Sequence, residues 1–361
     1  MTVHVVLAGG GSAGHVSPLL ATADALRRAD PSVGISALGT SEGLESRLVP
    51  EAGYDFVVVP KVPLPRKPSG ALFRVPGRLR TAVRTAGEHL DAVGASAVVG
   101  FGGYVSVPAY LAARKRGIPI VVHEANSRAG IANRLGARWA AVVAVTVPVG
   151  LRAEQLVGLP LRRDITSLDR AASRAAARAS FGLRPDGPVL LVTGGSLGAR
   201  RLNGAVTASA AELDRAGVQV LHVTGEKNAE DVRAALVDPP PSYHLLAYVN
   251  GMQSAYAASD LVLCRAGMNT CAELAVVGLP AVYVPLPVGN GEQALNAKPT
   301  VDAGGGLLVA DEDVDAGYVT STVLPLALDE GRLAVMGQAA RRLGHPHADD
   351  ELAALIAKVA R

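Results

Sequence analysis

The sequence predicts two doubly wound α/β domains, each built on a parallel sheet, and three observations lead to this fold class. The chain has 361 residues, more than one hydrophobic core usually serves, so its length favours two domains. Short runs rich in β-branched residues alternate with alanine-rich stretches of helical period, as they do in βαβ units. This pattern starts twice, each time with a strand, a glycine-rich turn and a helix, which is typical of two Rossmann-like domains.

The first half of the chain alternates strands and helices from its beginning. The expected strands are short and apolar, as fits a sheet buried on both faces. They are Val3–Leu7, Ile35–Leu38, Phe56–Val59, Ala97–Gly100, Ile120–His123 and Val142–Val145. The expected helices between them are Ser17–Arg28, Gly43–Ala52, Arg74–Val93, Val107–Lys115 and Ile131–Ala137.

The second half repeats the pattern after a helix at Arg170–Ala179. Its expected strands are Val189–Val192, Val218–Val223, Tyr243–Leu246, Leu261–Cys264, Ala281–Val284 and Gly306–Val309. A proline and several charged residues interrupt the periodicity at Leu159–Ile165, so we expect domains at residues 1–160 and 161–345. Residues 346–361 are expected to pack back on the first domain through an amphipathic helix at Asp349–Ala360, whereas His345–Glu351 is interpreted as a hydrated loop.

Composition excludes several classes of protein. Hydrophobic residues make up 49% and charged residues 19%, which argues against disorder, and a net charge of +3 is too small to predict nucleic-acid binding. Two cysteines cannot form a disulfide framework, so a reducing compartment is expected. The start of the chain is typical of a buried strand rather than a signal peptide, and no apolar run approaches roughly 18 residues. We therefore expect a soluble cytoplasmic protein, with peripheral membrane contact left open.

The first glycine turn runs from Gly9 to His15. Gly9, Gly11 and Gly14 satisfy the G-x-G-x-x-G pattern, in which backbone N–H groups approach an anion at a helix N-terminus. A purely structural turn is an equal alternative. NAD binding would also need an acidic residue at the end of the second strand, but that strand ends before Thr40 and Glu42 lies beyond it. The pattern therefore gives an NAD-dependent oxidoreductase little support.

Two polar residues beside glycine turns are candidates for chemistry. His15 lies at a helix entrance, where an imidazole can act as a general base or bind a phosphate, or only cap the helix. Ser196, in the second glycine turn Thr193–Arg200, can donate its hydroxyl to a phosphate or cap the helix that follows.

The segment Cys264–Pro287 has the pattern of a nucleotide site. A strand ends at Cys264, Gly267 forms a turn, and Asn269 or Thr270 begins a helix whose N-terminus suits a diphosphate. Glu273 follows one turn later, and its carboxylate can accept two hydrogen bonds from a ribose diol.

The loop after the next strand gathers side chains that suit sugar hydroxyls, because amides donate and accept hydrogen bonds at once. These polar residues are Asn290, Glu292, Gln293 and Asn296. They follow the carboxyl end of a strand, where open α/β sheets bind their ligands.

Seven segments together resemble the MurG family of glycosyltransferases in order and spacing. They are HVVLAGGGSAGHVSP, VVGFGGYVSVPA, VVHEANSRAGIANR, GLPLRRD, LVTGGSLGARRLN, CRAGMNTCAEL and GNGEQALNA, and the likeness extends from Val3 to about Ile356. The resemblance implies a GT-B fold, in which two Rossmann-like domains face a central cleft. It also implies an inverting transfer of N-acetylglucosamine from UDP-N-acetylglucosamine to the muramyl 4-hydroxyl of undecaprenyl-diphosphate-linked lipid I, which gives lipid II for peptidoglycan.

The resemblance also implies roles for individual residues. His15 matches the first-domain loop that faces the donor sugar, and it is our first candidate for the base. The residues matched to UDP-sugar binding are Ser12, Ala13, Gly14, Asn126, Arg162, Ser196, Val249, Met268, Asn269, Thr270, Cys271, Ala272, Glu273 and Gln293. Within that set, Val249 matches the residue whose backbone contacts uracil, and Glu273 matches the ribose acceptor. The turn Gly102, Gly103 and Tyr104 is the candidate for the acceptor diphosphate.

A basic, partly apolar segment extends from Lys61 to Arg84 without an acidic residue. Such a surface suits an anionic membrane, and a solvated helix face with a proline loop is the alternative. The residues expected to contact the membrane are Arg66, Lys67, Leu72, Phe73 and Leu79. The family docks its lipid acceptor through the first domain, so we expect peripheral attachment to the cytoplasmic face of the cell membrane.

Three alternatives remain at this stage. Leu197 and Asn269 depart from the family pattern, which leaves open a divergent paralogue with a different acceptor or a role in antibiotic self-protection. A UDP-sugar epimerase shares the two-domain architecture, and an NAD-dependent oxidoreductase rests on the first glycine turn alone. No metal site and no cofactor are predicted, and the sequence does not require a divalent cation.

Overall fold

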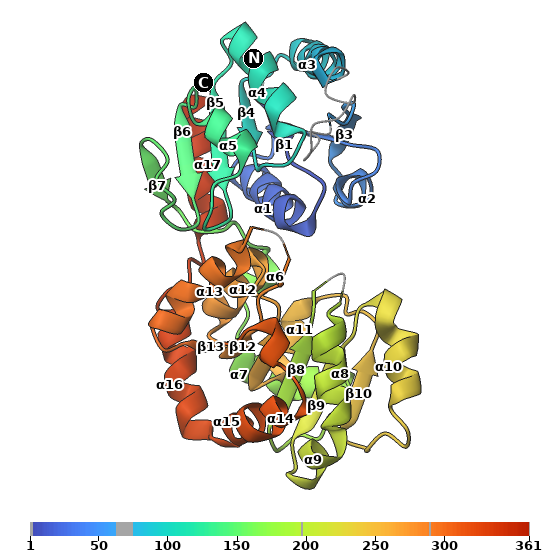
Figure 1. Cartoon of the computed structure of the whole chain (residues 1–361). Helices are drawn as coiled ribbons and strands as arrows, with labels where there is room; N and C mark the ends of the chain where they lie inside the picture. The colour runs from blue at the N-terminus through green and yellow to red at the C-terminus, as the bar shows by residue number, and fades with distance from the viewer. Residues whose placement is uncertain (1–2, 63–74, 196–197, 289, 361) are drawn as a thin grey trace. The chain divides into compact units, whose positions relative to one another are not determined.

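The chain forms two compact units, which Figure 1 shows in the colours of the sequence. The structure is a computed structural model that describes residues 3–62, 75–195, 198–288 and 290–360. One unit consists of Met1–Arg162 and His347–Arg361, and the other of Arg163–Pro346. The C-terminal segment therefore belongs to the first unit, and the expected boundaries at residues 160 and 345 differ from these by no more than two residues.

The first unit contains, within the described residues, a seven-stranded sheet in the order β3-β2-β1-β4-β5-β6-β7, and every pair of neighbours is parallel. The strands are β1 His4–Ala8, β2 Gly34–Gly39, β3 Asp55–Val58, β4 Ala97–Gly100, β5 Ile120–Glu124, β6 Val142–Val145 and β7 Glu154–Leu156. The six predicted strands are confirmed, each end within one residue. β7 was not predicted, because three residues without a β-branched side chain carry no strand signal.

Helices cover both faces of this sheet. They are α1 Ala13–Ala29, α2 Glu45–Glu51, α3 Val75–Ala92, α4 Ser106–Arg116, α5 Ile131–Gly136 and α17 Ala348–Val359. Helix α1 begins four residues before the expected start, because the glycine turn leads directly into it with Ser12 as an extended N-cap residue. His15 therefore lies in the first turn of α1.

Alternate side chains of the strands pack into separate cores on the two faces. Val5 and Leu7 of β1 pack into a core that also contains residues of α1 and α17, and their neighbour Val6 packs with α3 and α4 on the other face. Figure 1 shows α17, in red, beside the strands of this unit.

Helix α17 is fastened to α1 by an ion pair. Asp349 is 3% exposed and accepts a hydrogen bond of 2.5 Å from the Arg28 guanidinium, which also reaches Asp350. The interpretation of His345–Glu351 as a hydrated loop is thus wrong for its acidic end. The sequence could not reveal this, because the partner cation lies more than 300 residues away.

The second unit contains a six-stranded parallel sheet in the order β10-β9-β8-β11-β12-β13 among the residues that the structure describes. The strands are β8 Val189–Thr193, β9 Gln219–Val223, β10 Tyr243–Leu246, β11 Leu261–Cys264, β12 Ala281–Tyr283 and β13 Gly306–Leu308. All six predictions are confirmed, again within one residue at each end.

The helices of the second unit include several short ones that sequence periodicity did not predict. The α-helices are α6 Arg163–Thr166, α7 Arg170–Ser180, α8 Arg200–Ala208, α9 Ala210–Arg215, α10 Ala229–Ala235, α11 Met252–Ala258, α12 Met268–Val277, α13 Glu292–Asp302, α14 Ala316–Tyr318, α15 Leu324–Leu328 and α16 Glu330–Arg341. Two 3₁₀ turns, Glu226–Asn228 and Asp311–Asp313, and a π-helical segment, Val319–Val323, complete the unit. No helix in the described part of the chain is long and apolar enough to cross a membrane.

Strand order indicates where each unit would bind a ligand. The order reverses between β1 and β4 in the first sheet and between β8 and β11 in the second. In open parallel sheets, loops diverge at such a switch point and leave a crevice outside the carboxyl ends of the strands. The predicted pair of doubly wound domains is therefore confirmed, and each switch point lies beside a glycine turn.

Each sheet also buries a neutral histidine. His123 in β5 and His222 in β9 are both fully buried. Burial lowers the pKa of His123 to about 4, against the opposing effect of its hydrogen bond to the Gly158 carbonyl, and lowers that of His222 to about 3. The His222 ring lies between the Tyr243 hydroxyl, at 2.7 Å, and the Asn203 amide oxygen, at 3.0 Å.

We expect both units to lose stability as pH falls from about 7.5 to about 5.5. The unfolded state takes up a proton on each histidine below a pKa of about 6.5, whereas the folded state does so only at about 4 and about 3. The stabilisation is complete above the unfolded pKa and is lost as pH falls, by roughly 1.4 kcal/mol per pH unit per histidine. Urea midpoints at the two pH values measure this. A His222→Gln variant should show a shallower pH dependence, and an unchanged dependence would contradict the assignment.

Candidate functional site

The switch point of the first sheet is formed by two glycine turns in direct contact. The turn after β1 contains Gly10 and Gly11, and the turn after β4 contains Gly102 and Gly103, of which all but Gly10 have positive φ angles between 80° and 98°. A side chain at Gly103 would place its Cβ 2.6 Å from the Gly10 carbonyl oxygen. The second turn can approach the first this closely only because residue 103 is a glycine.

A buried carboxylate, that of Glu45, supports the first turn from beneath. Its oxygens accept hydrogen bonds of 2.9 Å from the backbone N–H groups of Gly11 and Thr40 and from the Thr40 hydroxyl. Burial raises the pKa of Glu45, but these hydrogen bonds outweigh it and hold the pKa below its ordinary value. The charge therefore persists at neutral pH, and it already uses an N–H that a diphosphate would need.

Sequence reasoning considered only Glu42 near this turn, and found it beyond the place where a ribose acceptor is expected. Glu42 is exposed and forms an ion pair of 2.9 Å with Lys61. Glu45 was missed because it lies inside the expected helix. The signal was the set of nearby glycines, since a Cβ at Gly10, Gly39 or Gly43 would overlap the Glu45 side chain.

His15 lies at the contact between the two turns, with one ring face against Gly102. Its Nδ1 is 3.0 Å from the Gly10 carbonyl oxygen and 3.3 Å from the Ser12 hydroxyl. A carbonyl can only accept, so Nδ1 carries the proton and the lone pair is on Nε2. A Cβ at Gly102 would lie 3.0 Å from Nε2. The geometry thus prepares Nε2 as a proton acceptor at the carboxyl edge of the sheet.

The predicted site residues of the first unit follow three adjacent strands, and His15 comes after the first of them, β1. Gly102 and Gly103 follow β4, and Asn126 follows β5. Glu124, which is 3% exposed, holds this last loop by accepting from the backbone N–H groups of Asn126 and Gly130. Tyr104 is 46% exposed beside them. Because β1, β4 and β5 are neighbours, the structure brings these predicted residues to one edge of the first sheet.

The first glycine turn of the second unit follows β8. The Thr193 hydroxyl accepts a hydrogen bond from the Gly195 N–H, and a Cβ at Gly198 would lie 2.2 Å from the Thr224 carbonyl oxygen. The turn is therefore close-packed against the loop after β9. The predicted phosphate ligand Ser196, with its neighbour Leu197, lies outside the described residues.

The N-terminus of helix α12 is the second candidate site in this unit. It begins at Met268 with Gly267 as its N-cap, so it starts slightly before the predicted Asn269 or Thr270. The first hydrogen bond of the helix runs from the Cys271 N–H to the Gly267 carbonyl. Met268 and Thr270 come before Cys271, so their N–H groups have no carbonyl partner within the helix. Nothing lies within 4 Å of a Cβ built on Gly267. An anion therefore has room beside a helix N-terminus.

The predicted residues along α12 differ in what they can offer. Thr270, Ala272 and Glu273 are half-buried, whereas the Met268 and Cys271 side chains are buried in the core. Burial raises the pKa of the Cys271 thiol to about 12, so its side chain is a neutral core group. Glu273 accepts a hydrogen bond of 2.7 Å from the buried hydroxyl of Tyr256 in α11, a partner that sequence reasoning missed.

The remaining predicted donor residues lie on nearby loops. Gln293, in the first turn of α13, accepts from the Leu286 N–H at 2.9 Å and thereby shapes the loop after β12. The Val249 side chain is 8% exposed, so its backbone is the part that a ligand could contact. Arg162 is an exposed residue at the end of the first unit's main segment. None of these assignments is tested by the structure, and they stay predictions.

Most of the residues that were predicted to contact the membrane lie outside the described residues. They are Arg66, Lys67, Leu72 and Phe73. Leu79 in α3 is half-buried and packs against the core of its unit, which leaves its neighbours Arg78, Arg80 and Arg84 exposed.

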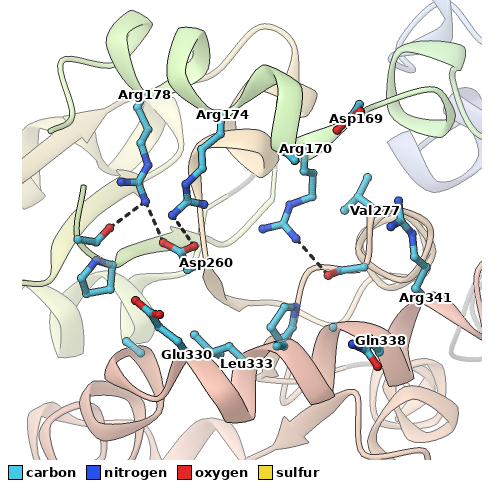
Figure 2. A pocket seen from close by; sticks show the side chains of 18 of the residues that line it. Asp169, Arg170, Arg174, Arg178, Asp260, Val277, Glu330, Leu333, Gln338 and Arg341 are labelled. Carbon is cyan, nitrogen blue, oxygen red and sulfur yellow. Dashed lines mark hydrogen bonds and ion pairs between the residues drawn. The ribbon is translucent and has the colours of Figure 1, made fainter. Parts of the chain in front are cut away.

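A cavity of about 710 Å³ in the second unit lies away from these turns. Its lining includes Pro188, Asp260 and Pro280, which directly precede β8, β11 and β12, so it lies at the amino edge of the sheet. Figure 2 shows Arg170, Arg174 and Arg178 extending into it from α7. Arg174 and Arg178 both form ion pairs with Asp260, at 2.7 and 3.0 Å. These ion pairs hold α7 to the chain just before β11.

An acidic run, Asp311–Asp315, has the Asp-x-Asp spacing of a cation site, which sequence reasoning overlooked. Asp311, however, pairs with Arg265 at 2.6 Å and with Arg201 at 3.4 Å. Among the described residues, no group of three histidine, cysteine or acidic side chains is placed to hold a metal ion.

Comparison with known proteins decides among the families that use this fold. The model for the glycosyltransferase family 28 N-terminal domain matches residues 5–145, and that for the C-terminal domain matches residues 189–352. The chain belongs to glycosyltransferase family 28. The family 28 assignment confirms the resemblance predicted from the sequence and explains why both glycine turns fall inside matched regions.

Individual relatives narrow the assignment. The family 28 chain is 56% identical to the UDP-N-acetylglucosamine--N-acetylmuramyl-(pentapeptide) pyrophosphoryl-undecaprenol N-acetylglucosamine transferase of Streptomyces avermitilis, over 98% of both chains. It resembles the crystal structure of MurG from Acinetobacter baumannii with a TM-score of 0.79, 29% identity and 99% coverage of each chain. These likenesses confirm the GT-B fold class.

The same fold also serves other chemistry. The UDP-GlcNAc 2-epimerase of Neisseria meningitidis, solved with UDP-GlcNAc bound, resembles the chain with a TM-score of 0.68 and 13% identity, over 99% of this chain and 100% of the other. At that identity the likeness shows the fold alone. Fold similarity therefore does not separate the epimerase from the transferase, whereas family membership does.

A Gly267→Ala change should weaken UDP binding roughly 10-fold or more while leaving the fold intact. The φ angle of −64° and the open space around Gly267 accept a methyl group without strain, so an effect on binding would come from a ligand that approaches there. Calorimetric titration with UDP measures this. Gly204→Ala is the matched control, because Gly204 lies in α8 with equally open surroundings. Equal UDP affinity in the two variants would remove α12 from the donor site.

Proposed function

We propose that this chain transfers N-acetylglucosamine from UDP-N-acetylglucosamine to the muramyl 4-hydroxyl of a lipid I acceptor, giving lipid II. The observation that carries the proposal is the 56% identity to the Streptomyces avermitilis transferase across 98% of both chains. Fold similarity would fit several activities, whereas identity at this level covers nearly the whole of both chains, and family 28 models match both units.

The donor is proposed to bind at the carboxyl edge of the second sheet. The N-terminus of α12 offers N–H groups and a positive dipole end to the diphosphate, with open space at Gly267. The Glu273 carboxylate, one turn further, is proposed to accept hydrogen bonds from both ribose hydroxyls. Developing charge on the leaving diphosphate would be stabilised at this helix end.

The acceptor hydroxyl is proposed to attack the anomeric carbon of the donor directly. A bond forms from the acceptor oxygen to that carbon while the bond from the carbon to the diphosphate oxygen breaks, and UDP leaves with the electron pair. His15 Nε2 is proposed to take the hydroxyl proton, because the Gly10 carbonyl holds the ring in the tautomer with its lone pair there. One displacement from the opposite side inverts the anomeric configuration.

The geometry of the first glycine turn disfavours the NAD-dependent alternative. Glu45 already accepts the Gly11 N–H and places a negative charge beneath the turn. A dinucleotide diphosphate would meet electrostatic repulsion where its fingerprint should offer N–H donors. The divergent paralogue stays open, because the departures at Leu197 and Asn269 concern the choice of substrate rather than the fold.

Peripheral attachment to the cytoplasmic face of the membrane is part of the proposal. Support comes from the first unit, where Arg78, Arg80 and Arg84 of α3 are exposed, and Tyr104 and Ile131 are 46% and 76% exposed. Cationic and apolar side chains together favour an anionic lipid surface, which is also where a lipid-linked acceptor would be found.

UDP release from UDP-N-acetylglucosamine should depend on a short-chain lipid I analogue. A direct displacement needs the acceptor hydroxyl, so we expect release only with acceptor present, together with a disaccharide product identified by mass spectrometry. Conversion of the donor to its 2-epimer without acceptor would instead establish the epimerase. Donor binding without release would favour a paralogue with a different acceptor.

His15 and Glu273 should affect different kinetic constants. His15→Asn removes the proposed base and should lower kcat roughly 100- to 10,000-fold with little change in donor affinity. Glu273→Ala should weaken UDP binding roughly 10- to 100-fold and alter kcat far less, since it removes ribose hydrogen bonds. Steady-state kinetics and calorimetry with UDP measure the two effects. The base assignment fails if His15→Asn retains kcat, and the ribose assignment fails if Glu273→Ala retains affinity.

A further inference from the structure

Glu273 is held by a buried tyrosine on the neighbouring helix. Tyr256 in α11 is 2% exposed, and its hydroxyl donates to Glu273 Oε2 at 2.7 Å. The carboxylate is half-buried, so it lies at the boundary between this core contact and the surface. A glutamate on a surface helix ordinarily samples several rotamers, whereas this contact favours one.

The tyrosine is a hydrogen-bond donor at every physiological pH. Burial, followed by the negative charge of Glu273, raises the pKa of the Tyr256 phenol well above its ordinary value. The phenol therefore keeps its proton and donates it to the carboxylate. A carboxylate has about four acceptor positions, so the bond to Tyr256 takes up one of several.

Arg170 secures the two helices that carry this pair. Its guanidinium donates to the Tyr256 and Ser259 carbonyls at the end of α11, at 3.2 and 2.6 Å, and to the Gly278 carbonyl at the end of α12, at 3.1 Å. Figure 2 shows the bond to Gly278 at the amino edge of the sheet. Burial lowers the pKa of Arg170 to about 10, so the cation persists at neutral pH and suits two helix C-termini.

We propose that Tyr256 is a positioning residue for nucleoside recognition, which fixes the Glu273 carboxylate so that it meets both hydroxyls of the donor ribose. The proposal rests on the proposed function, because it assigns a ribonucleotide to this site. It makes Tyr256 a determinant of specificity for ribonucleotides over 2′-deoxyribonucleotides. A tyrosine that only fills the core would contribute to stability but not to this discrimination.

The test compares UDP with 2′-deoxy-UDP on the full chain by calorimetric titration. Wild-type protein should bind UDP more tightly than 2′-deoxy-UDP. Tyr256→Phe removes the hydroxyl that donates to Glu273 and with it this constraint on the carboxylate, so UDP affinity should fall roughly 3- to 30-fold. The affinity for 2′-deoxy-UDP should fall much less, and the ratio of the two affinities should move toward one.

Tyr243→Phe provides a matched control. Tyr243 in β10 belongs to the same unit, is 8% exposed, and directs its hydroxyl to His222 rather than to Glu273. This variant also loses a buried phenol hydroxyl, so thermal unfolding of both variants shows what the loss costs in stability. The ratio of two affinities measured on one sample does not depend on the fraction of folded protein. A destabilised variant therefore still gives a valid ratio.

Two outcomes would overturn the positioning role. One is a wild-type ratio of the two affinities in Tyr256→Phe, whether or not both affinities fall. The other is wild-type protein that binds the two nucleotides equally well. Failure of wild-type protein to bind UDP at all would instead overturn the proposed function, and the positioning role with it. A reduced ratio in Tyr256→Phe alone, with a wild-type ratio in Tyr243→Phe, is the expected result.

Discussion

All neighbouring strands in both sheets run parallel, and this constraint determines where the functional residues can gather. Carboxyl ends of parallel strands share one edge, so loops that are distant in the chain become neighbours there. His15, Gly102 and Asn126 follow three different strands of the first sheet and meet at its edge for this reason. The strand order also reverses beside β1 and β8, which makes the turn after each of them the expected place for a ligand.

The two units use similar glycine turns for opposite electrostatic purposes. In the first unit, Glu45 occupies the Gly11 N–H and leaves a negative charge beneath the turn, which suits a site that handles a proton rather than a phosphate. In the second unit, the N-terminus of α12 faces open space at Gly267 without such a carboxylate among its described contacts. One Rossmann-like scaffold thus supports a candidate base in one unit and a candidate anion site in the other.

Support for the candidate donor site extends through the second sheet to its far edge. Tyr256 joins α11 to α12 through Glu273, and Arg170 joins the C-termini of the same two helices. The cavity lined by the α7 arginines therefore belongs to the structural support of the site, since Asp260 and backbone carbonyls engage those cations. Buried polar contacts at the amino edge thus hold the two helices that carry candidate residues at the other edge.

The sequence by itself determined the positions of the strands, apart from the three-residue β7, and the family of this protein. Strand positions followed from apolar runs between turn residues, and the predicted strands were correct to within one residue at each end, because β-branched runs and glycine turns are local signals. Candidate residues at the turns, such as His15 and Glu273, were named for the same reason. The tertiary structure alone decided which distant groups complete them: Glu45 beneath the first turn, Tyr256 against Glu273, and Asp349 against Arg28. These partners lie between 17 and 321 residues apart, and residue type or periodicity at one position carries no information about a contact that only packing creates.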